Sequence, residues 1–542
     1  MTRFTTPRTR GFALGLVALG AFRRADGQVG APAPDPPPRG TPPRGTPPDG
    51  TPRARPALAL EDVVRRALVE NPDLRVSRLT VDAARGAALS AASVFDMQLQ
   101  ANAQSQHANN LLYTTKLTSV LATTQTYSVG VAKRLRAGGI VLTPQLNMVQ
   151  SATPGVGQAL SSASATLGVV VPLARDRGGV LSRVGEIAAG LEADATSWDA
   201  RQTASSAVLQ AVDAYWAYLA AQRRRDVSVA SEARAASILE DTRALVKADE
   251  RPPADLVQLR GNVATQAAAR IAAEQAVVEA WQQLALLLAL PPDVVANPPA
   301  PSTDFPAWSA GGSGDSVSVA DAAGRALVPQ ALRARADVTA AGTRAEEAQR
   351  SAAALATAFR PQIDLSAQFG YSGLEPGQGF GHVVGPLYRN TSPLNATVLL
   401  SYHLPLANDD ARGRALQADA SFEQARVARR EVTRRAAMGV VVAAEALRRA
   451  RLSLGEYQRS TALAQETVTN ERRKFQLGTS TVLDLIYAED ALTNAQLAEA
   501  GGRQQYAAAI VRLRYETGSL VVNDGPSAHV PLDALLRAPD LP

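Results

Sequence analysis

Side chains that could carry out enzymatic chemistry are few and far apart in this sequence. It has no cysteine, and its histidines (His107, His382, His403 and His529) form no H-x-H or H-x-x-x-H pair. These features argue against disulfides, thiolate ligands and a histidine-rich metal centre. The glycines of Gly377-x-Gly379-x-Gly381 are spaced as in a phosphate-binding loop, but no Lys-Ser/Thr pair follows and no predicted helix begins there. The sequence therefore predicts a surface loop at these glycines, no enzyme active site, no cofactor and no metal.

Two aspartates occupy matching positions just after turns that join predicted helices. Asp484 follows the turn at Gly478-Thr479, and Asp255 follows the turn at residues 249–253, which contains two prolines. Glycine allows the positive φ that ends a helix, whereas proline interrupts one helix and favours the start of the next. One interpretation is that each aspartate stabilises a helix N-terminus in solvent. The alternative, a role in an ion pathway, depends on a resemblance described below.

The elements that position these turns occur twice along the chain. Residues 60–75 and 319–333 share an aspartate, the run Arg-Ala-Leu-Val and a Leu-Arg pair, with one gap. Each half then reads as helix, strands, long helix and helix, which indicates an internal two-fold repeat. The predicted divisions are a signal peptide at 1–27, a Pro-rich linker at 28–57, a first repeat at 58–300, a linker at 301–317, a second repeat at 318–520 and a C-terminal tail at 521–542.

The predicted helices are too long for a globular core. They span residues 58–92, 176–249, 253–290, 318–357, 407–476 and 479–518. A helix of 70 residues would be ~105 Å long, which suits a coiled coil or an extended tube. Apolar or small side chains recur every seven residues at Leu447, Leu454, Thr461, Val468 and Phe475. This heptad pattern predicts a coiled-coil seam.

Short segments of alternating apolar and polar residues predict strands. They lie at residues 95–104, 125–134, 139–149, 163–171, 361–371 and 396–404. One apolar face suits the wall of a membrane β-barrel, and so few strands require several chains to share one barrel. The residues predicted to face lipid are Phe95, Met97, Leu99, Ile363, Leu365, Val398 and Leu400. A soluble periplasmic coiled-coil scaffold or adaptor is the competing hypothesis, but it gives no reason for the apolar strand face.

Charge and targeting signals point to export and away from nucleic acid. Arginines at positions 3, 8 and 10 precede a short apolar run at 11–22, which is typical of a secretory signal peptide. Residues 1–57 hold nine arginines and three aspartates, so the rest of the chain carries 47 basic and 47 acidic residues. A nucleic-acid-binding protein needs its basic excess on the folded body, and none is present there.

This order of elements resembles the outer-membrane efflux protein family, the TolC-like channels. The resemblance covers residues 58–520 and rests on three stretches: 67–74, which reads Ala-Leu-Val-Glu-Asn-Pro-Asp-Leu; the Pro-Leu pairs after the strands at 163–171 and 396–404; and 473–497. In the last stretch the residues that fit the family pattern are Lys474, Phe475, Gly478, Asp484, Leu485, Ala488, Asn494 and Ala495.

The resemblance implies a mainly α-helical protein with a membrane β-barrel portion. Three copies would share a 12-stranded barrel in the outer membrane, with four strands each, above a periplasmic α-barrel of coiled-coil helices. A periplasmic membrane-fusion adaptor and an inner-membrane pump, of the resistance type or the ABC type, would dock at its lower end. The implied function is a passive conduit for efflux or type I secretion. Because this chain has six strand signals, the number of strands stays open, and the additional pair at 125–149 is alternatively a hairpin outside the membrane.

The resemblance also implies a site at the helix tips. Carboxylates there line the entrance, and in a trimer each would form a ring of three that attracts cations. The entrance residues it implies are Asp484, Asp255, Phe475, Tyr487 and Arg251, and the adaptor-contacting residues are Leu477, Gly478, Thr479 and Ser480. The chain departs from the family's known latches, because Phe475 lacks a hydroxyl, Ser480 replaces a basic residue and Tyr487 replaces a carboxylate. Arg251 is therefore a candidate for holding a closed state.

Overall fold

The structure is a computed structural model, which describes residues 57–113, 117–153, 157–292, 297–308, 317–523 and 528–539. The predicted signal peptide and all but the last residue of the Pro-rich linker lie outside these ranges. The described residues fall within one compact unit that contains both predicted repeats.

The two repeats contain matching sets of helices. They are α1 (Leu60–Glu70), α2 (Pro72–Ala92), α3 (Val180–Lys247) and α4 (Ala254–Leu287) in the first, and α6 (Val317–Ala334), α7 (Ala336–Leu355), α9 (Asp409–Gln476) and α10 (Val482–Glu516) in the second. The long helices α3 and α9 have 68 residues each, and α4 and α10 have 34 and 35. The predicted internal repeat is thus confirmed, and the lengths of the long helices and of the helices that follow them match between its halves.

Each opening helix is divided in two, where the sequence predicted one continuous helix. In the first repeat the division is at Asn71, whose side chain accepts hydrogen bonds from the backbone of Asp73 and Leu74. Pro72 follows, lacks an N–H and disfavours helical geometry in the residue before it. In the second repeat Arg335 has an extended backbone between α6 and α7.

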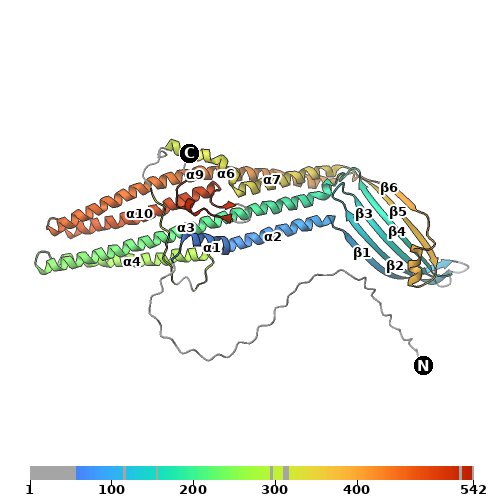
Figure 1. The fold of residues 1–542 in the computed structure, drawn as a ribbon, viewed down its shortest axis with the longest axis horizontal. Helices are drawn as coiled ribbons and strands as arrows, with labels where there is room; N and C mark the ends of the chain where they lie inside the picture. Colours follow the sequence, from blue (N-terminus) through green and yellow to red (C-terminus); the bar gives the residue numbers. More distant parts are fainter. Residues whose placement is uncertain are drawn as a thin grey trace, which may run out of the picture. The chain divides into compact units, whose positions relative to one another are not determined.

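Six strands form one antiparallel sheet in sequential order. They are β1 (Gln98–Tyr113), β2 (Leu117–Arg134), β3 (Val141–Ala152), β4 (Leu160–Pro172), β5 (Gln362–Pro376) and β6 (Asn395–His403). All six predicted strand segments are confirmed, and the additional pair at 125–149 lies inside the sheet as part of β2 and β3. Within the described unit, the sheet lies at one end of the helices (Figure 1).

The strand register gives the sheet one apolar and one polar face. Leu99 lies opposite Val131, and Leu365 lies opposite Leu400. The apolar face carries Leu99, Val129, Leu146, Leu167, Phe369, Leu365, Val398 and Leu400. Side chains alternate along a strand, so the opposite face carries the polar residues Gln100, Asn102, Ser128, Asn147, Ser164, Gln368 and Ser366.

The predicted lipid-facing residues follow this pattern with one exception. Leu99 is 71% exposed, Val398 and Leu400 are also exposed, Ile363 and Leu365 are half-buried, and Met97 is exposed just before β1. Phe95 is a correction: it ends the short 3-10 helix η1 (Ser93–Phe95) and is 1% exposed. Its ring lies under the guanidinium of Arg136, at 5.0 Å, so it packs at the junction of helices and sheet.

The main core lies where α1, α3, α4 and α10 meet. The largest fully buried side chains there are Tyr215, Trp216 and Tyr218 of α3 and Trp281 of α4. Ala507 and Val511 of α10 join the same cluster, together with Leu520, Val521 and Leu535 near the C-terminus. The two repeats therefore share one core, and part of the predicted C-terminal tail is folded into it. None of the described helices is both long and apolar enough to cross a membrane.

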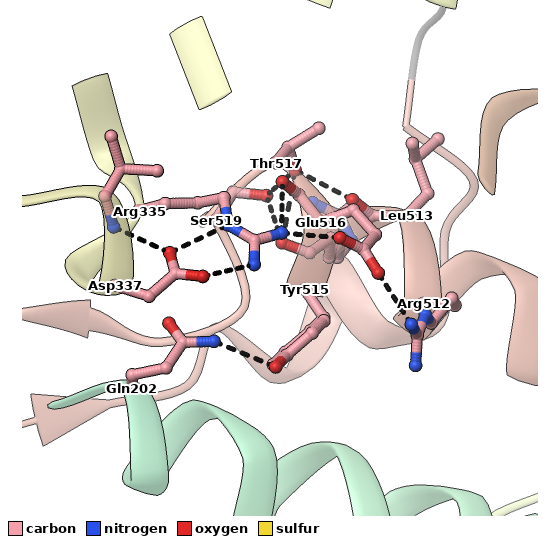
Figure 2. Close-up of polar contacts among 11 residues, drawn as sticks. Gln202, Arg335, Asp337, Arg512, Leu513, Tyr515, Glu516, Thr517 and Ser519 are labelled. Carbon is pink, nitrogen blue, oxygen red and sulfur yellow. Dashed lines mark hydrogen bonds and ion pairs between the residues drawn. The ribbon is translucent and has the colours of Figure 1, made fainter. Parts of the chain in front are cut away.

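A buried ion-pair network fixes the division between α6 and α7 to the end of α10 (Figure 2). The Arg335 guanidinium donates to both carboxylate oxygens of Asp337, at 3.0 and 2.7 Å, and to the carboxylate of Glu516. Arg512 binds the other oxygen of Glu516 at 2.7 Å. Because Arg335 and Glu516 are both buried, each needs the other as a charge partner.

Short elements complete the described chain. They are η2 (Ala356–Phe359), α8 (Phe380–Val384), η3 (Gly385–Leu387), β7 (Val522–Asn523), β8 (Ala528–His529) and α11 (Leu532–Leu535). The glycine-rich segment differs from the expectation in one respect, because Gly379 precedes the five-residue helix α8. The seventy residues of sequence around it contain no Lys-Ser/Thr pair, so the short helix α8 does not make this segment a phosphate-binding loop.

Candidate functional site

The two long helical hairpins end in the same type of turn. Asp249 after α3 and Gly478 after α9 both have positive φ, at 60° and 75°. In both turns the next amide donates to a carbonyl five residues earlier, from Glu250 to Leu245 and from Thr479 to Lys474, each at 3.0 Å. This pattern of bonds is a Schellman ending, which satisfies carbonyls at the helix end. The tips of the two hairpins are thus structural equivalents, with Arg251 at the position that Ser480 occupies in the second repeat.

Arg251 joins the two tips directly. Its guanidinium donates to the backbone carbonyls of Phe475, at 3.2 Å, and Ser480, at 3.0 Å. The same guanidinium lies 4.4 Å from the centre of the Phe475 ring. One planar cation therefore caps the end of α9, binds the turn after it and covers its aromatic side chain. This contact holds the two hairpins together within one chain.

Phe475 belongs to a small apolar core at the tips. It is buried with Ile238 of α3, Leu259 of α4 and Leu485 of α10. The heptad prediction is confirmed here, since Leu447, Leu454, Val468 and Phe475 are all buried along α9. In a single chain the ring therefore faces its own coiled coil.

Asp484 caps the N-terminus of α10. Its carboxylate accepts from the backbone N–H of Thr481 at 3.1 Å, while the Thr481 hydroxyl accepts from the Asp484 N–H at 3.2 Å. The Thr481 hydroxyl also donates to this carboxylate at 2.6 Å, and these hydrogen bonds lower the pKa of Asp484. The helix-stabilising interpretation describes what Asp484 does within one chain, and the exposed carboxylate stays charged at neutral pH.

The remaining predicted residues are divided between the surface and the interior of the tips. Asp255 is half-buried in the first turn of α4, and Tyr487 is exposed on α10. Leu477 is 74% exposed, and Thr479 is also exposed. Ser480 is a correction, because its side chain is 8% exposed and its hydroxyl donates to Glu471 at 2.9 Å. That side chain is thus unavailable for contact with an adaptor.

A buried carboxylate above the tips links three helices, and the sequence predictions did not include it. Glu489 of α10 is 8% exposed. One of its oxygens accepts from Arg234 of α3 at 2.8 Å, and the other accepts from Arg472 of α9 at 2.9 Å. A signal was present in the sequence, since Glu489 shares a helical face with Leu485 and Leu492. A charged residue on an apolar face must find partners.

Hydrogen bonds extend this site to the fourth helix. Thr493 of α10 accepts from Arg234 at 3.1 Å and lies 3.0 Å from the hydroxyl of Ser231. Gln266 of α4 accepts from Ser231 at 3.1 Å and donates to Asp490 at 3.0 Å. Burial and the neighbouring Glu489 charge raise the pKa of Asp490. We call these residues, with Glu489 and Arg472, the interhelix network.

The chemistry available at these sites is binding and positioning. In the described ranges, no group of three or more histidine, aspartate or glutamate side chains is placed to hold a metal ion. The arrangement instead fixes the relative position of two coiled-coil hairpins through cations and carboxylates. Such contacts stabilise the packing of one hairpin against the other.

Comparisons with known proteins agree with this architecture. Residues 327–519 match the family model described as outer membrane efflux protein. Similar solved structures include the CmeC outer membrane channel of Campylobacter jejuni, with 15% identity, 85% of each chain covered and a TM-score of 0.63. They also include a membrane protein from Pseudomonas aeruginosa, with 19% identity, coverage of 85% of this chain and 90% of that chain, and a TM-score of 0.63.

A third similar structure is the outer membrane protein VceC from Vibrio cholerae. It is 18% identical, the alignment covers 85% of this chain and 96% of that chain, and the TM-score is 0.61. At such identities the likeness establishes the fold, which is that of the TolC-like outer-membrane channels. Among curated proteins, none matches the chain in sequence.

Proposed function

We propose that this chain, whose residues 327–519 match the outer membrane efflux protein family, is a subunit of an outer-membrane channel for efflux or type I secretion. The observation that carries the proposal is the pair of faces on the six-stranded sheet. An apolar face on every strand is what a lipid-facing barrel wall requires, and a polar face is what a water-filled lumen requires. A soluble scaffold or adaptor would leave the apolar face exposed to water.

The proposed location follows from the same geometry. The sheet would lie in the outer membrane, and the helices would extend from it into the periplasm. A helix of 68 residues, such as α3 or α9, is about 100 Å long. The channel is proposed to be passive, because its sites bind and position rather than catalyse. An inner-membrane pump, of the resistance or the ABC type, would supply the energy.

The partners are proposed from the resemblance and from the tips. Three copies would close the barrel and the helical tube, and a periplasmic adaptor would contact the exposed tip residues Leu477 and Thr479. In such a trimer Asp484 and Asp255 would each form a ring of three carboxylates at the entrance. Tyr487, exposed on the face of α10 one turn further along, would line the same passage.

The test compares two neighbouring residues of β1 that lie on opposite faces. Leu99→Arg places a charge on the proposed lipid face, a change that costs ~2–4 kcal/mol at the membrane midplane and less toward its interfaces. Gln100→Arg places the same charge on the proposed lumen face. We expect the Gln100 variant to assemble in the outer-membrane fraction and the Leu99 variant to be lost from it, as measured by fractionation and crosslinking. A wild-type protein recovered as a soluble monomer would overturn the proposed function.

A further inference from the structure

The additional strand pair is as well formed as the rest of the sheet. β2 and β3 have 18 and 12 residues, and a membrane-spanning strand needs only ~9–11. β2 pairs with β1 from Gln98↔Ala132 to Tyr113↔Leu117, along the whole length of β1. β3 pairs with β4 from Val141↔Val170 to Ser151↔Leu160. The pair is therefore inserted between β1 and β4 as two full wall strands.

In the part of the sheet nearest the helices, the two faces continue across this pair. Val129 of β2 and Leu146 of β3 lie opposite each other, and both are exposed. Ser128 and Asn147, one residue along, are likewise paired and belong to the polar face. An apolar surface groove runs from β2 across β3 and β4 to β5, lined in part by Pro144, Leu146, Leu167 and Phe369. A hairpin in water would have no use for this apolar strip, whereas a wall inside a membrane requires it.

The sheet has two open edges, at β1 and at β6. Six antiparallel strands in sequential order leave these two edge strands pointing in opposite directions. An edge in hydrocarbon cannot leave its backbone N–H and C=O groups unpaired. The β6 edge of one copy and the β1 edge of the next therefore have the directions that antiparallel pairing needs.

We propose that each chain contributes six strands to the shared wall, so that three copies close a barrel of 18 strands instead of the 12 of the resembling family. This inference rests on the proposed function and concerns its pore. Barrel diameter grows roughly linearly with strand number, so the lumen would be about half again as wide as that of a 12-stranded barrel. Barrels of 16–18 strands leave an open aqueous channel. The wall would then impose no constriction, and control of passage would fall to the helix tips.

The strand register also limits how copies join. On the apolar face, β1 carries odd-numbered residues such as Leu99 and Ala101, and β6 carries even-numbered ones such as Leu400 and Tyr402. A junction that keeps this face continuous must pair an odd residue of β1 with an even residue of β6. Since β1 begins and β6 ends near the helices, Ala101 should lie close to Leu400 of the next copy.

Introduced cysteines can count the strands, because the chain has none of its own. Ala101 faces Val129 across β1 and β2 in this structure. If the additional pair left the wall, β1 would instead lie beside β4 and face residues such as Ala165. Directly opposite residues have Cα atoms ~4.5–5.5 Å apart, which permits a disulfide.

The experiment is done on full-length protein assembled in the outer membrane. If each chain contributes six strands, the double variant Ala101→Cys/Val129→Cys forms a disulfide within one chain. The double variant Ala101→Cys/Leu400→Cys links neighbouring copies, up to trimers. The double variant Ala101→Cys/Ala165→Cys forms no disulfide. A disulfide in the Ala101–Ala165 pair, or its absence from the Ala101–Val129 pair, overturns the proposal.

A charge comparison provides a second readout that does not depend on oxidation. Leu146→Arg should prevent assembly, as Leu99→Arg does, whereas Asn147→Arg on the opposite face of β3 should assemble normally. Normal assembly of the Leu146 variant would place the pair outside the membrane and overturn the 18-stranded wall. The proposed function would survive that result as long as wild-type protein assembles and Leu99→Arg does not, so the two failures are distinguishable.

Discussion

Arg234 of α3 binds the buried carboxylate of Glu489 on α10 at 2.8 Å, and through it connects the two coiled-coil hairpins of one chain. The second oxygen of Glu489 is held by Arg472 of α9. Hairpins that separate must break this connection and leave a buried carboxylate with fewer partners. The interhelix network is therefore positioned to oppose movement of the hairpins above the tips.

Arg234→Ala should loosen the two hairpins. Losing one partner of a buried charged hydrogen bond costs about 1–3 kcal/mol, and Arg472 keeps part of the site intact. We expect higher basal conductance in planar bilayers, together with a lower melting temperature. Arg243→Ala is the matched control, because Arg243 pairs only with Glu240 on the same helix among the contacts described. Equal conductance in wild type and Arg234→Ala would show that this network does not oppose opening.

Arg251→Lys should release the tips from each other while keeping the positive charge. Lysine cannot donate from a planar group to two carbonyls and also stack on the Phe475 ring. Amide hydrogen exchange in the peptide 473–484 should accelerate about tenfold. Arg260→Lys, an exposed change on α4, serves as the control and should leave this exchange as it is. Unchanged protection in Arg251→Lys would mean that the apolar core around Phe475 suffices.

Two substitutions of Asp484 separate helix capping from a role in ion passage. Asparagine can still accept the capping hydrogen bonds but carries no charge, whereas alanine can neither accept these hydrogen bonds nor carry the charge. We expect both variants to reduce cation selectivity in planar-bilayer conductance, and only Asp484→Ala to lower the melting temperature as well. Selectivity identical to wild type in Asp484→Asn would leave capping as the function of this carboxylate.

Asp213 of α3 should make the protein less stable at neutral pH than at pH 4. Its Oδ1 is buried with no hydrogen-bond partner in the described part of the chain, and burial raises its pKa to about 6, against the opposing effect of Arg512. The folded state therefore binds this proton more tightly than the unfolded state, in which the pKa is ~3.9. Stability contributed by the protonated group is complete below pH 4 and is lost as pH rises through 6.

Asp213→Asn removes this dependence. The variant should gain about 1–3 kcal/mol at pH 7.5 and much less at pH 4, as measured by denaturant unfolding of the detergent-solubilised protein. Asp241→Asn, which changes an exposed carboxylate on the same helix, should give no such pH-dependent gain. A gain of equal size at both pH values would argue against titration of Asp213.

Local patterns were enough to predict most of the elements. Helix periodicity and strand alternation depend on neighbours in sequence, so α9 and β4 were placed within a few residues of their observed bounds. The turn chemistry of Asn71 was overlooked, and Phe95 was assigned to a strand because its alternation fits, although the chain forms a 3-10 turn there.

Contacts between distant residues were not predictable in the same way. Arg234 and Glu489 are 255 residues apart, and no periodicity connects them. Arg251 was identified as a candidate because the chain departs from the family's known latches, but its contact with Phe475 depends on how two hairpins pack. Ser480 was predicted to contact an adaptor because of the family resemblance, and the structure instead directs its hydroxyl to Glu471.

The equal lengths of α3 and α9 have a consequence for how such a protein can change. Each has 68 residues, so the two tips reach the same level and Arg251 can meet the turn after Phe475. An insertion into one helix alone would displace one tip by ~1.5 Å per residue and rotate its apolar seam by ~100°. Lengthening is therefore tolerable only as paired insertions, in steps that restore the heptad. The distance of the tips from the sheet is therefore set by two helices of equal length, one in each repeat.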